Sequence, residues 1–252
     1  MRNGQAGSQT QDGASRRQRS TNRREKKLIE QAYTLGEGLG LAVWRSDEAG
    51  PYATEPYPGA SWQPIGGPVR YSQKYQPNGT AKILTLFHPR SGQVRIRGVM
   101  RCPNYVLHTW AKQTLVDILS SLPSPAIEHD LANHDHWQKW RQDAEYLTLP
   151  ETLPPLRLLL VMDNLAGQQS KDFVEWLWQH GILPLCTPLG GSWLNMGESI
   201  QRLLKRRTLD GQTPTTPEQI IQWFQATATA WNADPTPFKW NGKRKRRQRS
   251  AH

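Results

Sequence analysis

The chain has 252 residues, a formal net charge of +11 and a pI of about 9.9. This length provides for one large domain or two small ones, and the excess of positive charge favours a polyanionic partner. Its two cysteines, Cys102 and Cys186, lack the spacing of a metal site and fit a reducing compartment. No apolar run approaches the roughly 20 residues of a membrane span, so we expect no membrane partner.

Much of the positive charge lies near the two ends, in Arg16–Lys27 and Lys243–Arg249. Blocks of like charge are commonly solvated, and they bind nucleic acid through its phosphates without reading sequence. Residues 1–24 also lack apolar periodicity, so we predict a disordered basic arm there. Residues 25–40 follow as a linker helix, KKLIEQAYTL, that stops at the glycines.

The first half of the remaining chain is rich in strands. A strand is predicted at Leu41–Arg45, and a proline-rich irregular loop at residues 50–79. Two further runs, 81–89 and 93–100, are joined by Arg90, Ser91 and Gly92. Val94 and Ile96 alternate with arginines in the second run, which predicts a β-hairpin.

The second half alternates helices with strands. After the helix Tyr105–Leu122 comes a polar stretch containing NHDHWQKW, for which we predict no regular element. The further predictions are a buried strand at Leu156–Met162, a helix at Ser170–His180, a strand at Ile182–Thr187, a helix at Ser192–Leu209, and a last helix from Thr216 to Trp231. Thr216 and Pro217 provide the N-cap and first-turn proline of that last helix.

This order predicts an α/β fold, with a mixed five-stranded sheet of three antiparallel strands followed by alternating helix and strand, and helices on both faces. Right-handed crossovers place parallel strands side by side, so the first strand should neighbour the strand that ends at Met162. Asp47 and Asp163 then meet at one end of two central strands, and Glu198 enters from the following helix. The arrangement is ribonuclease H-like.

Three carboxylates so placed suit hard divalent cations, which take oxygen ligands and keep several waters. Each acid also has a simpler interpretation. Asp47 could be a surface acid after a strand, and Asp163 could cap the turn that contains Asn164. Glu48 neighbours Asp47 but should face the other side of the sheet, so we expect it to support the site rather than bind metal.

The residues also resemble a known family. DEAG at Asp47–Gly50, MDNLAG at Met162–Gly167 and SWLNMGES at Ser192–Ser199 are similar to the three acidic motifs of DDE transposases, in the bacterial insertion-sequence branch of the mariner superfamily. Thirty-four residues separate Asp163 from Glu198, as in that superfamily, and NADPTPFKW at Asn232–Trp240 resembles the ending of the branch.

The resemblance implies that residues 41–231 form a catalytic domain and that 232–252 form a docking segment and basic tail. Asp47, Asp163 and Glu198 would be the catalytic residues and hold two Mg²⁺ ions, with Mn²⁺ as a substitute, and Asn164 and Asn195 would support them. The implied reaction is DNA strand cleavage and strand transfer. The implied partners are double-stranded DNA, as element ends and target, and a second copy of the chain on that DNA. A cytoplasmic, nucleoid-associated location follows.

The chain departs from the family pattern in two places. Gln168 and Gln169 stand where a His-Lys pair usually follows the second motif. The segment before the catalytic region has room for only a basic arm and one short helix, where the family has a helix-turn-helix region. A partner frame upstream could supply that region.

The helix that carries Glu198 has a cationic face. Arg202, Lys205 and Arg206 share that face, and apolar residues lie opposite it. A solvated Glu–Arg pair is the simpler interpretation, and DNA contact the functional one. The candidate DNA-binding residues are Arg202, Lys205, Arg206, Arg207, Lys243, Arg244, Lys245, Arg246 and Arg247. Two alternative functions stay open: a ribonuclease H-like nuclease without strand transfer, and a truncated, inactive DNA-binding remnant.

Overall fold

A mixed sheet of five strands in the order β3-β2-β1-β4-β5 forms the centre of the molecule. The computed structural model describes residues 22–54, 78–124, 130–141, 149–163, 170–188, 196–239 and 243–244. The strands are β1 (Ala42–Ala53), β2 (Thr80–Phe87), β3 (Val94–Val99), β4 (Leu158–Met162) and β5 (Ile182–Cys186). β1–β3 are antiparallel, whereas β4 runs parallel to both β1 and β5. The predicted ribonuclease H-like fold is confirmed.

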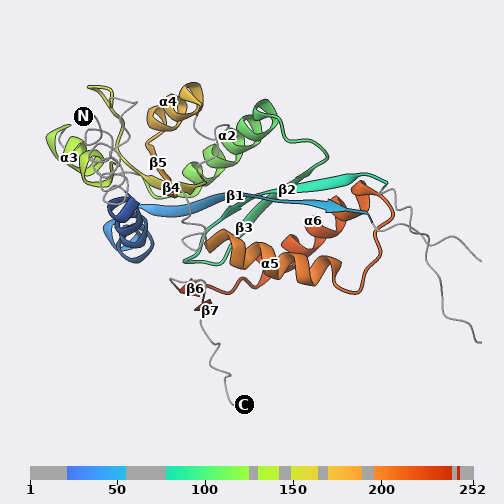
Figure 1. Ribbon diagram of the computed structural model, residues 1–252. Helices are drawn as coiled ribbons and strands as arrows, with labels where there is room; N and C mark the ends of the chain where they lie inside the picture. Colours follow the sequence, from blue (N-terminus) through green and yellow to red (C-terminus); the bar gives the residue numbers. More distant parts are fainter. Residues whose placement is uncertain are drawn as a thin grey trace, which may run out of the picture.

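Helices cover both faces of this sheet (Figure 1). Residues 22–35 are helical and lead into the 3-10 helix η1 (Gly36–Leu39). The other helices are α2 (Asn104–Ser121), α3 (Asp130–Trp140), α4 (Lys171–Gln179), α5 (Met196–Leu209) and α6 (Pro217–Ala233). α2 and α4 lie on one side of the sheet, and α5 and α6 lie on the other (Figure 1). No helix within the described ranges is long and apolar enough to cross a membrane.

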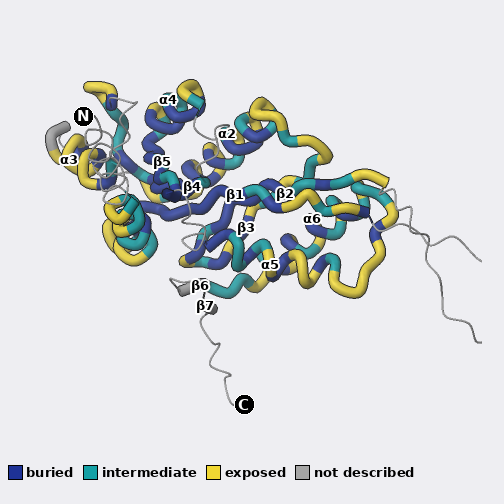
Figure 2. Tube along the Cα trace, viewed as in Figure 1, coloured by how far each residue is buried: buried dark blue, intermediate teal, exposed yellow. Residues whose placement is uncertain are grey.

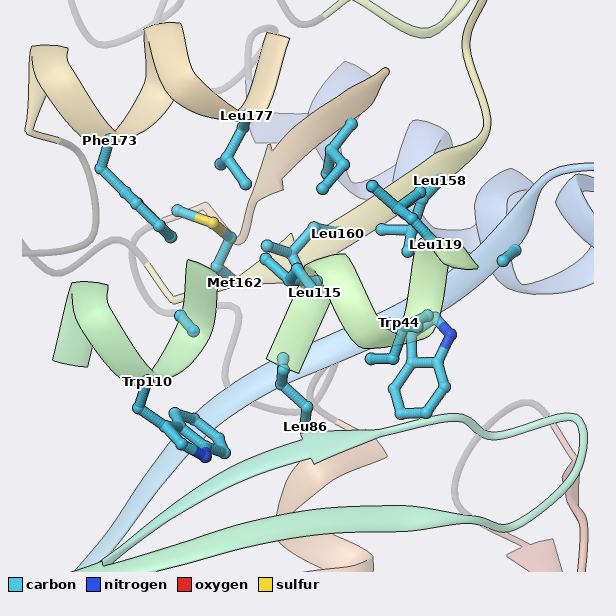
Figure 3. Close-up of a cluster of buried hydrophobic side chains, with 14 of the residues drawn as sticks. Trp44, Leu86, Trp110, Leu115, Leu119, Leu158, Leu160, Met162, Phe173 and Leu177 are labelled. Atoms are coloured by element: carbon cyan, nitrogen blue, oxygen red, sulfur yellow. The ribbon is translucent and has the colours of Figure 1, made fainter. Parts of the chain in front are cut away.

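Strand alternation sorts the core into two faces. Trp44 and Leu86 point toward α2, where they pack with Leu115 and with Leu160 of β4 (Figure 3). Val43 and its odd-numbered neighbours point the other way, toward the helix at 22–35, α3, α5 and α6. All five residues of β4 and the first six of β1 are buried, and the first part of β1 is accordingly dark blue in Figure 2. This is the burial that the continuous apolar run predicts.

β1 is longer than predicted. It continues beyond Arg45 through Asp47 to Ala53, because pairing with β2 resumes after a register shift between Ala49 and Tyr52. The prediction of a loop was therefore wrong for residues 50–53. The rest of that loop, residues 55–77, lies outside the described residues.

The polar stretch after α2 contains a helix that the sequence analysis missed. α3 buries Trp137 and Trp140, with 0% and 3% of their surface exposed, against the helix at 22–35 and β4. The indole Nε1 of Trp137 also donates to the carbonyl of Pro154, at 2.9 Å. Two aromatic side chains therefore attach an otherwise polar helix to the core.

The segment after α6 lies against the β2–β3 turn. The backbone N–H of Phe238 donates to Pro89 at 2.8 Å, and the indole of Trp231 donates to the carbonyl of Gly92 at 2.7 Å. Gly92 has φ +80°, and a Cβ there would lie 2.3 Å from the carbonyl oxygen of Thr236, so only glycine fits. β6 (Phe238–Lys239) then pairs with β7 (Lys243–Arg244). Part of the predicted basic tail is therefore a strand.

Candidate active site

The three predicted acids line one open cavity of about 410 Å³. Asp47 comes from β1, Asp163 from the residue after β4, and Glu198 from the first turn of α5. The complete lining is Asp47, Glu48, Ala49, Gly50, Tyr52, Asp163, Glu198, Gln201, Arg202 and Lys205. Tyr52 and Gln201 are not among the residues predicted from the sequence, although Gln201 lies between Glu198 and Arg202 in the sequence of α5.

The parallel register of β1 and β4 brings the two aspartates together. Arg45 lies opposite Val161, and Asp47 and Asp163 each follow by two residues. Because strand side chains alternate, both carboxylates lie on the face that α5 covers. Asp47 is buried, with 6% of its surface exposed, whereas the side chains of Asp163 and Glu198 are 30% and 45% exposed.

A buried arginine accompanies the acids. The Arg45 side chain is fully buried and its Nη2 donates to Oδ1 of Asp163. The Thr187 hydroxyl donates to the same carboxylate oxygen at 3.3 Å. The sequence analysis missed Arg45, but a signal was present: a charged residue inside an apolar strand, two positions before an acid, shares the face of that acid.

Glu48 borders the cavity, but its side chain points to the other face of the sheet from that of Asp47. Its carboxylate accepts a hydrogen bond of 2.7 Å from Lys82, and this bond raises the pKa of Lys82. Burial, reinforced by Glu48, raises the pKa of the Cys102 thiol to about 11. Cys102 is therefore a protonated thiol at neutral pH. Asn164 and Asn195, which were expected to support the acids, lie outside the described residues.

Two tyrosines border the acid cluster. Burial raises the pKa of Tyr52 to about 12, with a further contribution from Asp47, and its ring stacks on Phe224 at a centroid distance of 5.0 Å. Burial also raises the pKa of Tyr33, whose neighbouring charges are Arg45, Asp47 and Asp163. Both phenols stay protonated at neutral pH and add no negative charge to the site.

The candidate DNA-binding residues of α5 divide into two groups. Arg202 and Lys205 line the cavity, and Arg202 lies 3.7 Å from Glu198. Arg206 is exposed and follows on the same side. Arg207 instead lies over the Trp231 ring, 5.1 Å from its centroid, on the opposite side of the helix. This contact separates Arg207 from the cavity.

The remaining candidates come from the basic tail. Lys243 and Arg244 form β7, and their side chains are not among the described ones. Lys245, Arg246 and Arg247 lie outside the described residues.

The donor chemistry of the cavity fits a hard divalent cation. Carboxylate oxygens are the ligands that Mg²⁺ prefers, and the cavity is open enough for bound water to remain. Within the described ranges, however, no three His, Cys, Asp or Glu side chains are clustered closely enough to hold a metal. Asp163 is paired with Arg45, and Glu198 with Arg202. A shared metal ion would bind in addition to or in place of these ion pairs, and Oδ2 of Asp163, which accepts from neither Arg45 nor Thr187, is the oxygen that it would reach first.

Strand order and strand direction define a protein with the ribonuclease H-like fold, and three acids from separate elements line its cavity. Among solved structures, the catalytic core domain of BIV integrase is similar, with a TM-score of 0.39 and 12% sequence identity over 77% of this chain and 86% of that one. The strand order, rather than this likeness, defines the fold. No family model and no curated protein matches the chain.

Proposed function

We propose that this chain is the catalytic domain of a DDE transposase, of the bacterial insertion-sequence branch of the mariner superfamily. It would cleave DNA strands and transfer them in a metal-dependent reaction. The observation that carries the proposal is the convergence of Asp47, Asp163 and Glu198 on one cavity. The motif resemblance and the thirty-four-residue spacing support the choice of class.

Asp47, Asp163 and Glu198 would hold two Mg²⁺ ions, or Mn²⁺ in their place. The ions would supply an activated oxygen nucleophile and stabilise the leaving oxygen. Arg202 and Lys205, beside the acids, would hold the phosphodiester backbone in the cavity. Tyr52, which also lines the cavity, would remain a neutral hydrogen-bonding group there. Attack by water then cleaves a strand, and attack by a DNA 3′-hydroxyl joins two strands.

The proposed partner is double-stranded DNA, both as the ends of a mobile element and as its target. Arg202, Lys205 and Arg206 provide a continuous cationic side to α5 next to the acids, which is suited to a duplex backbone. The family resemblance adds a second copy of the chain on the DNA. It also adds a separate helix-turn-helix frame for reading the element ends.

A joining assay tests the proposal. The purified chain is incubated with Mg²⁺, a plasmid target and a precleaved oligonucleotide that ends in a 3′-hydroxyl. We expect the wild type to join the oligonucleotide to the plasmid and Glu198→Gln to lose this activity. Asp210→Asn, which changes an exposed acid just beyond α5, is the matched control and should keep it.

The other outcomes identify the alternatives. Hydrolysis without joining would indicate a ribonuclease H-like nuclease. DNA binding without any chemistry would indicate an inactive remnant. Joining by Glu198→Gln at the wild-type rate would contradict the assignment of the metal ligands.

A further inference from the structure

The most unusual charge in the described part of the protein is the guanidinium of Arg45. Its side chain is fully buried on the central strand β1, where aliphatic and aromatic residues predominate. An arginine stays protonated in proteins, so its charge is not relieved by loss of a proton and requires a nearby anion. That anion is Asp163, which arrives from β4.

The hydrogen bonding of Arg45 is incomplete. Nη2 donates to Asp163, whereas Nε and Nη1 are buried and have no hydrogen-bond partner within the described residues. A guanidinium that supported only the fold would be expected to use its full set of donors. The hydrogen bond to Asp163 places the charge of Arg45 directly at a carboxylate of the candidate site.

Asp163 already shares one of its oxygens. Oδ1 accepts from Arg45 and from Thr187, which leaves Oδ2 for any other partner. Asp47 lies on the same face, two residues beyond Arg45. With Arg45 present, these two aspartates and the guanidinium carry one net negative charge rather than two. A divalent cation that binds to Asp47 and Asp163 is therefore attracted less strongly, because the positive charge of Arg45 lies close by.

We propose that Arg45 is a built-in countercation that holds the two aspartates together without metal and competes with a divalent metal for Asp163. This inference rests on the proposed function, since it concerns the same acids. Metal binding is then weaker than the carboxylates alone would give. The metal-free protein, in turn, is protected from the repulsion between Asp47 and Asp163. Arg45 is a positioning residue in this scheme and touches no substrate.

The test is a thermal melt of the whole chain without DNA, first in EDTA and then with increasing MgCl₂. In EDTA, we expect the melting temperature of Arg45→Met to be lower than that of the wild type. With MgCl₂, it should rise by more than that of the wild type. The Mg²⁺ concentration at half of that rise should fall about tenfold, because the variant removes a buried positive charge that repels a divalent cation at the neighbouring carboxylates. Adding Asp163→Asn to Arg45→Met should abolish the gain.

Lys82→Met is the matched control. Lys82 also pairs with an acid of β1, Glu48 at 2.7 Å, but on the opposite face of the sheet. It should leave the response to Mg²⁺ unchanged. If Arg45→Met is unfolded in EDTA, recovery of its far-UV circular dichroism with MgCl₂ supports the proposal, and failure to recover overturns it.

The inference and the proposed function fail in different ways. The countercation role is overturned if MgCl₂ raises the melting temperature of Arg45→Met no more than that of the wild type, or if Lys82→Met shows an equal gain. Joining activity of the wild type would still support the proposed function. If MgCl₂ changes the melting temperature of neither the wild type nor Arg45→Met, the acids bind no Mg²⁺, and both proposals are overturned.

Discussion

The side chain of Asn232, near the end of α6, pairs with the backbone of Val94 as a neighbouring strand would. Its Oδ1 accepts from the Val94 N–H at 2.9 Å, and its Nδ2 donates to the Val94 carbonyl at 2.7 Å. Val94 begins β3, the edge strand of the sheet. One amide therefore satisfies both backbone groups of Val94, which would otherwise be open at the edge of the sheet.

Asn232→Asp should destabilise the protein by about 1–3 kcal/mol at neutral pH. The carboxylate keeps an acceptor for the Val94 N–H but places a negative oxygen against the Val94 carbonyl. Urea unfolding measures the change. Asn78→Asp, at an exposed amide that also bonds a carbonyl, is the control and should change stability by less than about 0.5 kcal/mol. Equal losses of stability in both variants would mean that the pairing at the sheet edge adds nothing.

Asp163→Asn should reduce stability as well as activity. The amide removes the carboxylate that bonds the buried Arg45, at a cost of about 3 kcal/mol. Metal-free thermal or urea unfolding measures it, with Asp117→Asn on the exposed side of α2 as the control. A wild-type melting temperature for Asp163→Asn would show that another anion compensates Arg45.

The apolar side of α5 should govern stability. Leu203 is 7% exposed and packs in the cluster that α5 and α6 form on the sheet. Leu203→Ala should therefore cost about 2–5 kcal/mol through the cavity it leaves. Lys205→Ala, on the cavity side, should leave the urea midpoint nearly unchanged. If Leu203→Ala leaves the free energy of unfolding unchanged, α5 is rotated about its axis and Glu198 does not face the aspartates.

The cationic side of α5 should govern DNA affinity. Reversing Arg202 and Lys205 to Glu should weaken binding to all duplex sequences alike. It should also reduce the logarithmic salt slope by about 0.9 for each DNA phosphate that the variant no longer neutralises. Fluorescence anisotropy at several salt concentrations measures both effects.

The control reverses Arg95 and Arg97, which are exposed on β3 and lie on the face opposite α5. The change in net charge is identical. An equal decrease in affinity for the two double variants would mean that DNA responds only to total charge.

Glu37 should make stability depend on pH in the acid range. Burial alone would raise its pKa, but hydrogen bonds from His88 and the Val43 N–H, with the nearby charge of Arg90, lower it below the ordinary 4.5. A depressed folded-state pKa adds stability above the unfolded-state pKa, and this is lost as pH falls through the folded value. Glu37→Gln should therefore be less stable than the wild type at pH 7, and the difference should shrink as pH falls below 4.5. Urea unfolding across pH 3–7 tests this, and a difference in the free energy of unfolding that is as large at pH 3 as at pH 7 would contradict it.

Much of the fold follows from periodicity and chain order. The run at Leu156–Met162 is apolar enough to be buried on both faces, and the crossover rule then places it beside β1. That step alone predicts that Asp47 and Asp163 lie together. Thr216 likewise caps α6, with its hydroxyl accepting from Gln219 as predicted.

The errors have physical reasons. α3 has few apolar residues, and its helix depends on two tryptophans that pack on elements distant in sequence, which periodicity within the segment does not reveal. The extension of β1 depends on pairing with β2 across Gly50, although glycine and proline usually end a strand. Arg45 was missed because an arginine beside a tryptophan in a strand is usually a surface residue, and only its partner on β4 shows that it is buried.

The contacts of the β2–β3 turn with the segment after α6 join residues that are distant in sequence. Val94 and Asn232 are 138 positions apart, and Gly92 and Trp231 are 139 apart. Closing so long a loop costs entropy before any contact is made, so we expect this junction to form late in folding. Until the junction forms, the start of β3 exposes unpaired backbone groups to other unfolded chains. Loss of the Asn232–Val94 contact would therefore favour aggregation through this edge of the sheet.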